Sequence, residues 1–390
     1  RGHTAPPTGR AVTMIPEANL VLAAYPNDRK MKLLRAADVA KWLPANLKKI
    51  TGESGTACEI LEAEVQPLRY VPDKRFTSRC RFVLKNGRNG TASTVSFVAK
   101  QLSDQRKARQ LFNSLRALEK TFRMTEATNG RYNYPVRIPR PLALFADKPV
   151  VFIEEIVGDN LKYVLPELDL KKYMHNVGAL LANFHKADKR VRKQITHRNE
   201  IAEVREAAFL VRKTFPAMSR DVRIFFKAFQ QAEWQDGTPR VLLHGSYRLN
   251  HIFVRGENLF LLDLDSIRMG HLAYDISNFL SSLYYLEAQG RFSQATREQI
   301  QLHFLRGYAA HTSFAISARA VLWFLASLLM NKQAFKYVTH GHDDREHKVE
   351  LMFDLAQKTL QTCLEITTGV GLDAVSRLLP EMSHRAQRAC

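Results

Sequence analysis

Three groups of polar residues stand where they could act on a phosphate. Lys100 ends the apolar run "VSFVAK", and a lysine at the end of such a strand can neutralise phosphate oxygens. Asp263 and Asp265 follow the apolar run "LFLL", and carboxylates exposed at a strand end suit Mg²⁺, which prefers oxygen ligands. Between these groups lies "HGSYRLNH", His244 to His251, a tight polar loop flanked by apolar stretches. Their order along the chain suggests nucleotide phosphate chemistry.

Taken alone, each of these features has a simpler structural explanation. An isolated lysine more often extends from the edge of a sheet into water. Asp263 could pair with an arginine such as Arg248 or Arg268, and Asp265 could cap the turn that follows it. Asp275 stands near the start of a predicted helix, where we expect it to bond backbone amides and hold the neighbouring loops. Only the combination favours a catalytic interpretation.

The elements that would position these residues fall into two groups. Apolar residues alternate in several short runs of residues 58–157, with turn residues between the runs and one helical pattern at 104–123. From Leu161 onward helical patterns dominate, apart from strands around 242–254 and 259–264. Because strands and helices are segregated, we predict an α+β fold with a small β-rich N-lobe and a larger, mainly helical C-lobe. The predicted divisions are 1–57 (arm and helix), 58–157 (nucleotide-binding N-lobe), 158–380 (C-lobe) and 381–390 (basic tail), with a ligand cleft between the lobes.

The net charge of +20 predicts attraction to anionic substrates, polyanions or acidic membrane surfaces, although a general effect on solubility would require no partner. The chain has no apolar run near the ~18 residues that a membrane span requires, and no nucleic-acid reading module is recognisable. No basic-then-apolar signal segment opens it, and its four cysteines lack metal-type spacing. Together these features predict a reduced, cytoplasmic protein.

From about Glu59 to Leu286 the sequence resembles the aminoglycoside phosphotransferase and choline kinase-like family. The segments "HGSYRLNH", "DLDS" and "GHLAYD" carry most of the resemblance, because they are similar to the family's catalytic loop, metal strand and the segment after it. The resemblance implies a bilobal protein-kinase-like fold, with ATP and Mg²⁺ as cofactors. It also implies transfer of a phosphate to a hydroxyl of a small molecule, sugar or glycan.

The same resemblance implies where the cofactors bind. Lys100 corresponds to the lysine that contacts the ATP phosphates, and Asp263 corresponds to the principal Mg²⁺ ligand. Glu154, Glu155 and Ile156 correspond to the hinge that touches the adenine. No glutamate of the following helix aligns with the one that pairs with this lysine in the family.

In the catalytic-type loop the correspondence is uneven. His244 matches the family's structural histidine, and Asp275 matches the structural aspartate after the metal strand. Ser246 stands where the family has its catalytic aspartate. His251 stands where the family has its second metal ligand, with Asn250 one residue early.

These substitutions leave three functions open. Ser246 can bond a hydroxyl but is a poor proton acceptor, and loss of a positioned base costs ~10²–10⁴-fold in rate. An active phosphotransferase would therefore use Asp265 or His251 as the base, and this is the interpretation we favour. The alternatives are a pseudokinase, which binds nucleotide or a partner with little catalysis, and a basic polyanion-binding protein on the same scaffold. For an active enzyme, the net charge favours a sugar, glycan or anionic acceptor over a polycationic aminoglycoside.

Overall fold

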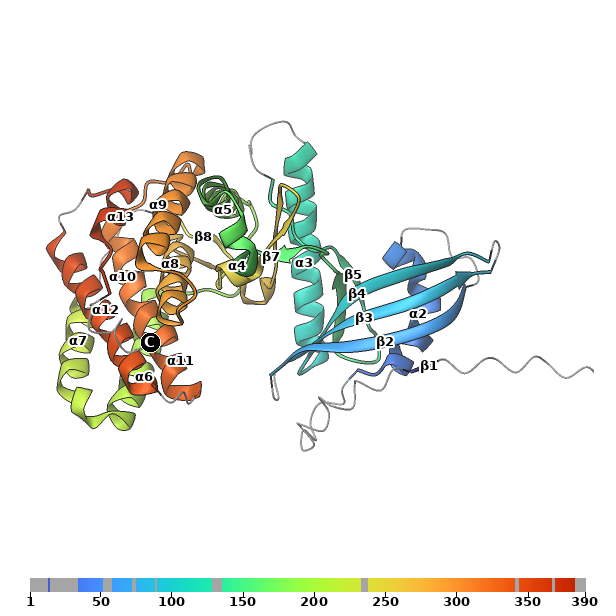
Figure 1. The fold of residues 1–390 in the computed structure, drawn as a ribbon, viewed down its shortest axis with the longest axis horizontal. Helices are drawn as coiled ribbons and strands as arrows, with labels where there is room; N and C mark the ends of the chain where they lie inside the picture. Colours follow the sequence, from blue (N-terminus) through green and yellow to red (C-terminus); the bar gives the residue numbers. More distant parts are fainter. Residues whose placement is uncertain are drawn as a thin grey trace, which may run out of the picture. The chain divides into compact units, whose positions relative to one another are not determined.

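A computed structural model describes residues 13–14, 34–51, 58–71, 75–87, 90–127, 135–232, 238–340, 344–366 and 369–382. The chain divides into unit 1, Arg1–Lys120 with Ile138–Val157, and unit 2, Thr121–Arg137 with Gly158–Cys390. Their helices and strands are labelled in Figure 1. Most of the predicted N-terminal arm and of the predicted basic tail lies outside the described residues.

Unit 1 is built on a six-stranded sheet with the order β1-β2-β3-β4-β6-β5. The predicted antiparallel meander is present as three long strands, β2 (Cys58–Val71), β3 (Arg75–Asn86) and β4 (Ala92–Leu102). The antiparallel strands β6 (Val150–Glu154) and β5 (Pro141–Leu144) extend it. The sequence did not predict β1 (Thr13–Met14), which runs parallel to β2 within the stretch interpreted as a loose arm.

One face of this sheet is covered by α2 (Ala36–Thr51), as Figure 1 shows. The Trp42 ring of this helix lies 4.3 Å from the Phe152 ring, centroid to centroid. Phe97 and Ala99 of β4 belong to the same core. Since neighbouring side chains of a strand point to opposite faces, Lys100 is directed to the face away from α2. The remaining helix of this region, α3 (Gln105–Ala127), begins after Asp104, whose carboxylate accepts a hydrogen bond from the amide of the third helical residue.

Unit 2 is mainly helical. Several of its helices begin at polar side chains that accept a hydrogen bond from an amide of the first turn, namely Asp169, Thr196 and Ser293. Its helices are α4 (Leu161–Val164), α5 (Leu170–His185), α6 (His197–Thr214), α7 (Ser219–Gln231), α8 (Ala273–Ala288), α9 (Gln294–His311), α10 (Ala318–Leu328), α11 (Phe335–His340), α12 (Arg345–Glu365) and α13 (Val375–Leu378). A single π-helical turn, η5 (Leu329–Ala334), joins α10 to α11.

The helices α5 and α9 pack unusually closely. A Cβ atom on Gly178 of α5 would lie 2.1 Å from the carbonyl oxygen of Phe304 of α9. Only glycine fits this position, because the neighbouring atom belongs to the backbone and cannot rotate away. The close packing fixes the position of the two helices relative to each other. Polar residues near their C-terminal ends meet as a result, and these residues belong to the site described below.

Short strands carry the loops of unit 2. The hairpin of β9 (Ile252–Arg255) and β10 (Asn258–Leu261) corresponds to the predicted strand pair, and β7 (Asp159–Asn160) adds to its edge. In contrast, β8 (Val241–Leu243) pairs with β11 (Arg268–Gly270). The loop between β8 and β9 therefore connects strands of two different sheets and is not the turn of a hairpin.

Candidate active site

The loop from His244 to His251 is held at its start by Asp275 of α8. The Asp275 carboxylate accepts hydrogen bonds from the backbone amides of His244 (2.6 Å) and Gly245 (2.8 Å). It is fully buried and lies in the first turn of its helix. Its position therefore joins α8 to the loop through backbone groups.

A second contact keeps this carboxylate charged. His185 Nε2 of α5 lies 3.2 Å from Asp275 Oδ2, and His185 Nδ1 lies 2.7 Å from the Tyr308 hydroxyl of α9. Burial on its own would raise the pKa of Asp275, but the contacts with His185 and the loop amides hold it below the ordinary value of 3.8. Asp275 is thus an acceptor for several donors and not a proton donor at neutral pH.

The middle of the loop is anchored by aromatic residues. The Tyr247 hydroxyl donates to the carbonyl oxygen of Val177 on α5 over 2.7 Å, and the Tyr247 ring is fully buried. His244 Nε2 lies 2.9 Å from the carbonyl oxygen of Leu262. Burial lowers the pKa of His244, so its ring is neutral and donates this hydrogen bond. Ser246, between these anchors, is half-buried, and its amide lies 3.3 Å from His244 Nδ1.

At the end of the loop His251 meets Asp263 and Arg248. His251 Nδ1 lies 2.8 Å from the carbonyl oxygen of Ser246, and His251 Nε2 lies 3.3 Å from Asp263 Oδ2. The Arg248 guanidinium also reaches His251 Nε2, through Nε at 3.1 Å and Nη2 at 2.9 Å. Because the guanidinium can only donate, Nε2 carries the lone pair and Nδ1 carries the proton.

The surroundings of His251 favour Asp265 over His251 as the base. Burial and the neighbouring Arg248 charge lower the pKa of His251 to about 2. Both of its ring nitrogens already have partners, so a hydroxyl proton would have no acceptor there.

The residues around Asp263 fit one Mg²⁺ ligand and not the pair implied by the resemblance. Mg²⁺ is commonly held by one or two carboxylates together with phosphate oxygens and water, which suits Asp263. His251 offers a nitrogen that already accepts from a guanidinium, and Asn250 is exposed at the surface. Among the described residues no group of three or more His, Cys, Asp and Glu is placed to hold a metal ion.

Two backbone features aim the acidic residues. Asp263 has φ of 60°, which is left-handed and rare for a residue other than glycine. It immediately precedes the 3₁₀ turn η4 (Leu264–Ser266), in which Asp265 is half-buried. The two carboxylates therefore stand on a tight turn and not at the end of a straight strand, as the sequence suggested.

The residues predicted to bind ATP all belong to unit 1. Lys100 is buried in β4, between Thr77 of β3 and Val151 of β6. At the end of β6 the Glu154 carboxylate accepts a hydrogen bond from the amide of Arg140. Arg79 of β3 forms an ion pair with Glu155, and Ile156 is buried. The carboxylates of Glu154 and Glu155 thus both have partners.

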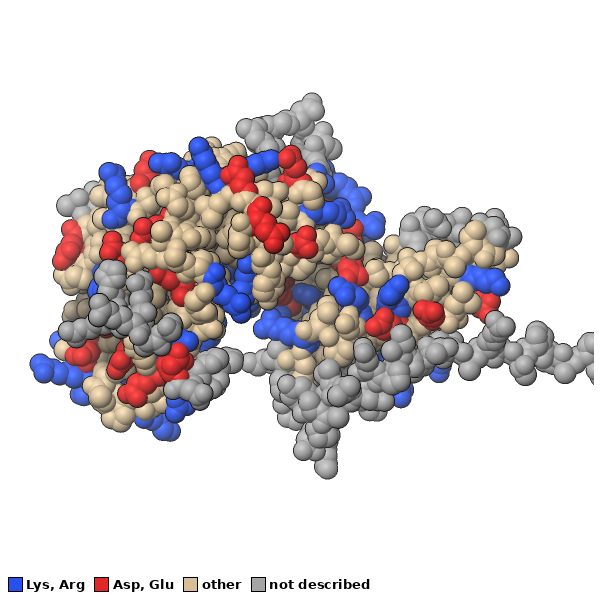
Figure 2. Space-filling view, in the orientation of Figure 1, with Lys and Arg blue, Asp and Glu red and all other residues tan. Residues whose placement is uncertain are grey.

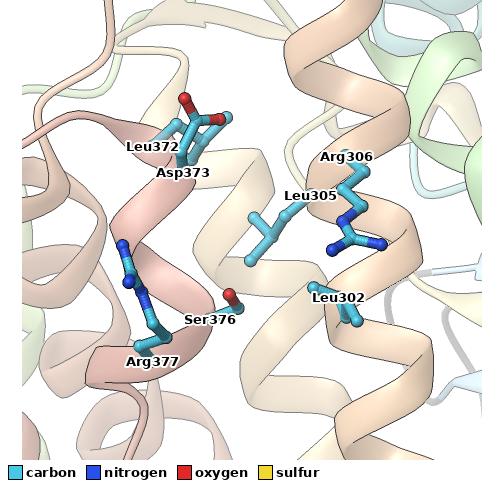
Figure 3. A pocket seen from close by; sticks show the side chains of 7 residues that line it. All are labelled: Leu302, Leu305, Arg306, Leu372, Asp373, Ser376 and Arg377. Carbon is cyan, nitrogen blue, oxygen red and sulfur yellow. The ribbon is translucent and has the colours of Figure 1, made fainter.

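A pocket of about 410 Å³ lies in unit 2 between α9 and the C-terminal turns, and none of the predicted site residues lines it. Arg306 of α9 and Arg377 of α13 flank it from opposite sides, as Figure 3 shows. Its walls are Leu302, Leu305, Arg306, Leu372, Asp373, Ser376 and Arg377. Its size would admit a small ligand, and its lining includes no residue of the loop from His244 to His251.

The surface carries charges of both signs. On the face shown in Figure 2, Lys and Arg are interspersed with Asp and Glu. In the described part of the chain, no helix combines the length and apolar character needed to cross a membrane.

Comparison with known proteins identifies the family and the fold. The sequence model of the phosphotransferase enzyme family matches residues 82–312, which is more than half of the chain. An amicoumacin kinase, solved with AMP-PNP, Ca²⁺ and its ligand, is 11% identical, with 75% of this chain and 87% of that chain covered and a TM-score of 0.52. A spectinomycin phosphotransferase with ADP and spectinomycin is 12% identical over 86% of this chain and all of that chain, with a TM-score of 0.49.

A third structure, a choline/ethanolamine kinase family protein from Mesorhizobium loti, is 13% identical over 91% of this chain and all of that chain, with a TM-score of 0.47. Among curated proteins, none matches the chain. The predicted α+β, protein-kinase-like fold is confirmed by the likeness to the amicoumacin kinase.

Among the residues of the site, His185, Tyr247 and Tyr308 were not singled out from the sequence. His185 ends the apolar helix "GALLANFH", where a buried histidine requires a polar partner, and this would have been a usable signal. Arg248 was considered only as an ion-pair partner of Asp263. Its contact with His251 spans three residues of the same loop and depends on a turn geometry that spacing alone does not specify.

Proposed function

Because the chain belongs to the phosphotransferase enzyme family, we propose that it is an ATP-dependent kinase that phosphorylates a hydroxyl of a small molecule, sugar or glycan. The main support is the loop from His244 to His251, whose backbone Asp275 holds through two amides. A loop fixed in this way can position a hydroxyl for in-line transfer, and positioning supplies much of the catalysis in such enzymes.

The proposal assigns the cofactor contacts residue by residue. Lys100 binds the phosphates of ATP, and the backbone of 154–156 binds the adenine. Asp263 would hold Mg²⁺, which neutralises phosphate charge when it is bound. The backbone strain at Asp263 supports this role, since strained residues cluster at functional sites.

The acceptor hydroxyl would be oriented by Ser246, with Asp265 as the residue that takes its proton. Ser246 is half-buried on the anchored loop, and its backbone amide donates to His244 Nδ1. Asp265 follows Asp263 by two residues on the same tight turn. With both ring nitrogens of His251 in use, Asp265 is the better of the two predicted bases.

A variant series with ATP turnover as readout tests this assignment. We expect Ser246→Asp to raise the rate by up to ~10²-fold, because it restores an acid at the position of the missing base. Ser246→Asn introduces a side chain of nearly the same shape as aspartate but without its charge, and serves as the matched control for Ser246→Asp. Asp265→Asn should lower turnover in the parent protein and lose most of its effect in the Ser246→Asp background, as expected for two acids that share one task.

Binding must be measured separately from turnover. We expect AMP-PNP with Mg²⁺ to raise the melting temperature of the parent protein, and Asp263→Asn to weaken that effect. If no nucleotide raises the melting temperature and no acceptor stimulates ATP consumption, the kinase proposal is wrong. If Asp265→Asn retains full turnover, only the assignment of the base fails.

A second candidate, a pseudokinase, is favoured by one contact. Arg248 donates to the nitrogen of His251 that faces Asp263, so a guanidinium stands beside the single retained metal-type carboxylate. Such a cation could neutralise part of the charge that Mg²⁺ neutralises in active kinases. This reading predicts nucleotide binding that persists in EDTA, and Arg248→Gln should make it depend on Mg²⁺.

A further inference from the structure

The π-helical turn η5 (Leu329–Ala334) presents a lysine to the interior of unit 2. Such turns are rare and occur frequently at functional sites. Lys332 of this turn lies over the Tyr274 ring, with Nζ 4.9 Å from the centroid, and Lys336 of α11 lies over the Tyr285 ring at 4.5 Å. Both rings belong to α8, so the two lysines follow the same helix.

An arginine extends this row toward the catalytic-type loop. The Arg268 guanidinium carbon lies 5.8 Å from the same Tyr274 ring that Lys332 covers. Arg268 Nε donates to the carbonyl oxygen of Ser266. It also lies 3.0 Å from the point where a Cβ on Gly245 would stand, next to Ser246. We call Arg268, Lys332 and Lys336 the cation row, and its inner end touches the loop.

Acids act on this row from a distance, and the charges of Glu200, Glu203 and Asp275 favour the charged form of Lys332. Among the described residues no carboxylate lies within ion-pair distance of Arg268 or Lys332. The strongest of these effects comes from the buried Glu200 of α6, whose Oε2 accepts hydrogen bonds from Ser327 (2.6 Å) and Asn331 (3.2 Å). Lys332 Nζ lies 3.4 Å from the Asn278 side-chain oxygen.

Titration supports the same interpretation. Burial, helped by the charge of Arg268, lowers the pKa of Lys332 to about 8, although the charge of Glu200 opposes this shift. Burial and the charges of Arg248 and Lys332 lower the pKa of Lys336 to about 7. Lysines whose charge is penalised in this way gain from a bound anion, which would return the pKa of each toward its ordinary value.

We propose that the cation row binds an anionic group of the acceptor, so that the substrate is a hydroxyl compound that also carries a phosphate or a carboxylate. The statement that the bound compound is a phosphate acceptor rests on the proposed function. The anion site itself involves residues of unit 2 alone. A polycationic acceptor such as an aminoglycoside would be repelled from this position.

Anion binding can be measured without catalysis. We expect inorganic phosphate at constant ionic strength to raise the melting temperature of the full chain. Glucose 6-phosphate and gluconate share a six-carbon polyol skeleton with glucose but carry an anionic group. In isothermal titration calorimetry we expect at least one of them to bind, while glucose does not. The compound that binds distinguishes a phosphate from a carboxylate.

The key variant is Lys332→Met, which keeps the length of the side chain and removes the charge. It should weaken phosphate binding by at least about tenfold. It should also raise the melting temperature without ligand, since it removes a buried cation that lacks an ion-pair partner. Lys336→Met gives a second, independent reading. Lys227→Met, which removes an exposed lysine of α7, is the matched control and should change neither quantity.

The outcomes separate the two proposals. Equal phosphate affinity in the parent protein, Lys332→Met and Lys336→Met overturns the anion site, whether or not AMP-PNP binds. Absence of any phosphate effect on the parent protein does the same. Loss of phosphate binding in both variants supports the site, and parallel titrations with AMP-PNP show whether the kinase proposal stands.

Discussion

Replacing Asp275 with alanine should lower the free energy of unfolding of unit 2 by about 3–5 kcal/mol. The buried carboxylate accepts hydrogen bonds from two loop amides, at 2.6 and 2.8 Å, and lies 3.2 Å from His185 Nε2. Each buried group left without a partner costs about 1–3 kcal/mol. Since a whole domain is stable by only about 5–15 kcal/mol, this loss is a large share of the total.

Asp275→Asn separates the charge from the shape. The asparagine keeps one oxygen that can accept from a loop amide. Its NH₂ group would face another donor and could not accept a hydrogen bond from it. We expect a loss of about half that of the alanine variant, roughly 2 kcal/mol. Asp188→Ala, which removes an exposed carboxylate of unit 2, is the control and should stay within about 0.5 kcal/mol of the parent protein.

Urea unfolding followed by tryptophan fluorescence measures these differences. Trp42 belongs to unit 1, so a Trp42→Phe background leaves only tryptophans of unit 2 to report the transition. A loss of less than about 1 kcal/mol for Asp275→Ala would refute the idea that this carboxylate holds the loop.

The effect should depend on pH in one direction. Folding depresses the pKa of Asp275 below 3.8, so its ionised form is favoured in the folded state. The stability that it contributes is complete above the unfolded pKa and is lost as the pH falls through the folded pKa. The gap between the parent protein and Asp275→Asn should therefore be constant near neutral pH and narrow only in acid.

Three further variants or reactions test other parts of the fold. Burial raises the pKa of Glu200 from 4.5 to about 6, so ionisation of this carboxyl destabilises the fold as the pH rises through this interval. Glu200→Gln should therefore raise the free energy of unfolding in urea by up to ~2 kcal/mol above pH 6, and should not change it well below pH 4.5. Gly178→Ala should remove at least about 1–3 kcal/mol by overpacking α5 against α9, whereas Gly371→Ala, which meets no neighbour, should have little effect on thermal unfolding. Burial raises the pKa of Cys80 to about 12, so mass spectrometry should find this thiol unalkylated at neutral pH until urea unfolds unit 1.

Local patterns sufficed for much of unit 1. The alternation in 75–86 and the turn residues on either side specify both the strands and their antiparallel order, because neighbours in the chain are neighbours in the sheet. The pairing of β8 with β11 was not predictable in the same way. Its partners are short and separated by a loop, a hairpin and a turn, so tertiary packing decides which strands meet.

The site shows the same limit more sharply. The sequence indicated the loop, Asp263 and Asp275, since strand ends and helix starts can be located from apolar runs. It did not indicate that His251 is buried against Arg248. The His251 ring, a candidate base from the sequence, instead accepts a hydrogen bond from the guanidinium. Lys332 stands in "SLLMNKQAF", which reads as an ordinary helix, and the π-helical turn that directs it inward leaves no mark in the apolar spacing.

The atoms that hold the catalytic-type loop are mostly not those that would do its chemistry. The Asp275 carboxylate accepts hydrogen bonds from main-chain amides, and the Tyr247 hydroxyl donates one to a main-chain carbonyl of α5. The shape of the loop therefore depends little on which side chain stands at 246. Single substitutions there can therefore alter or restore reactivity without unfolding the protein. The loop can thus accept different side chains at 246 while it keeps its backbone shape.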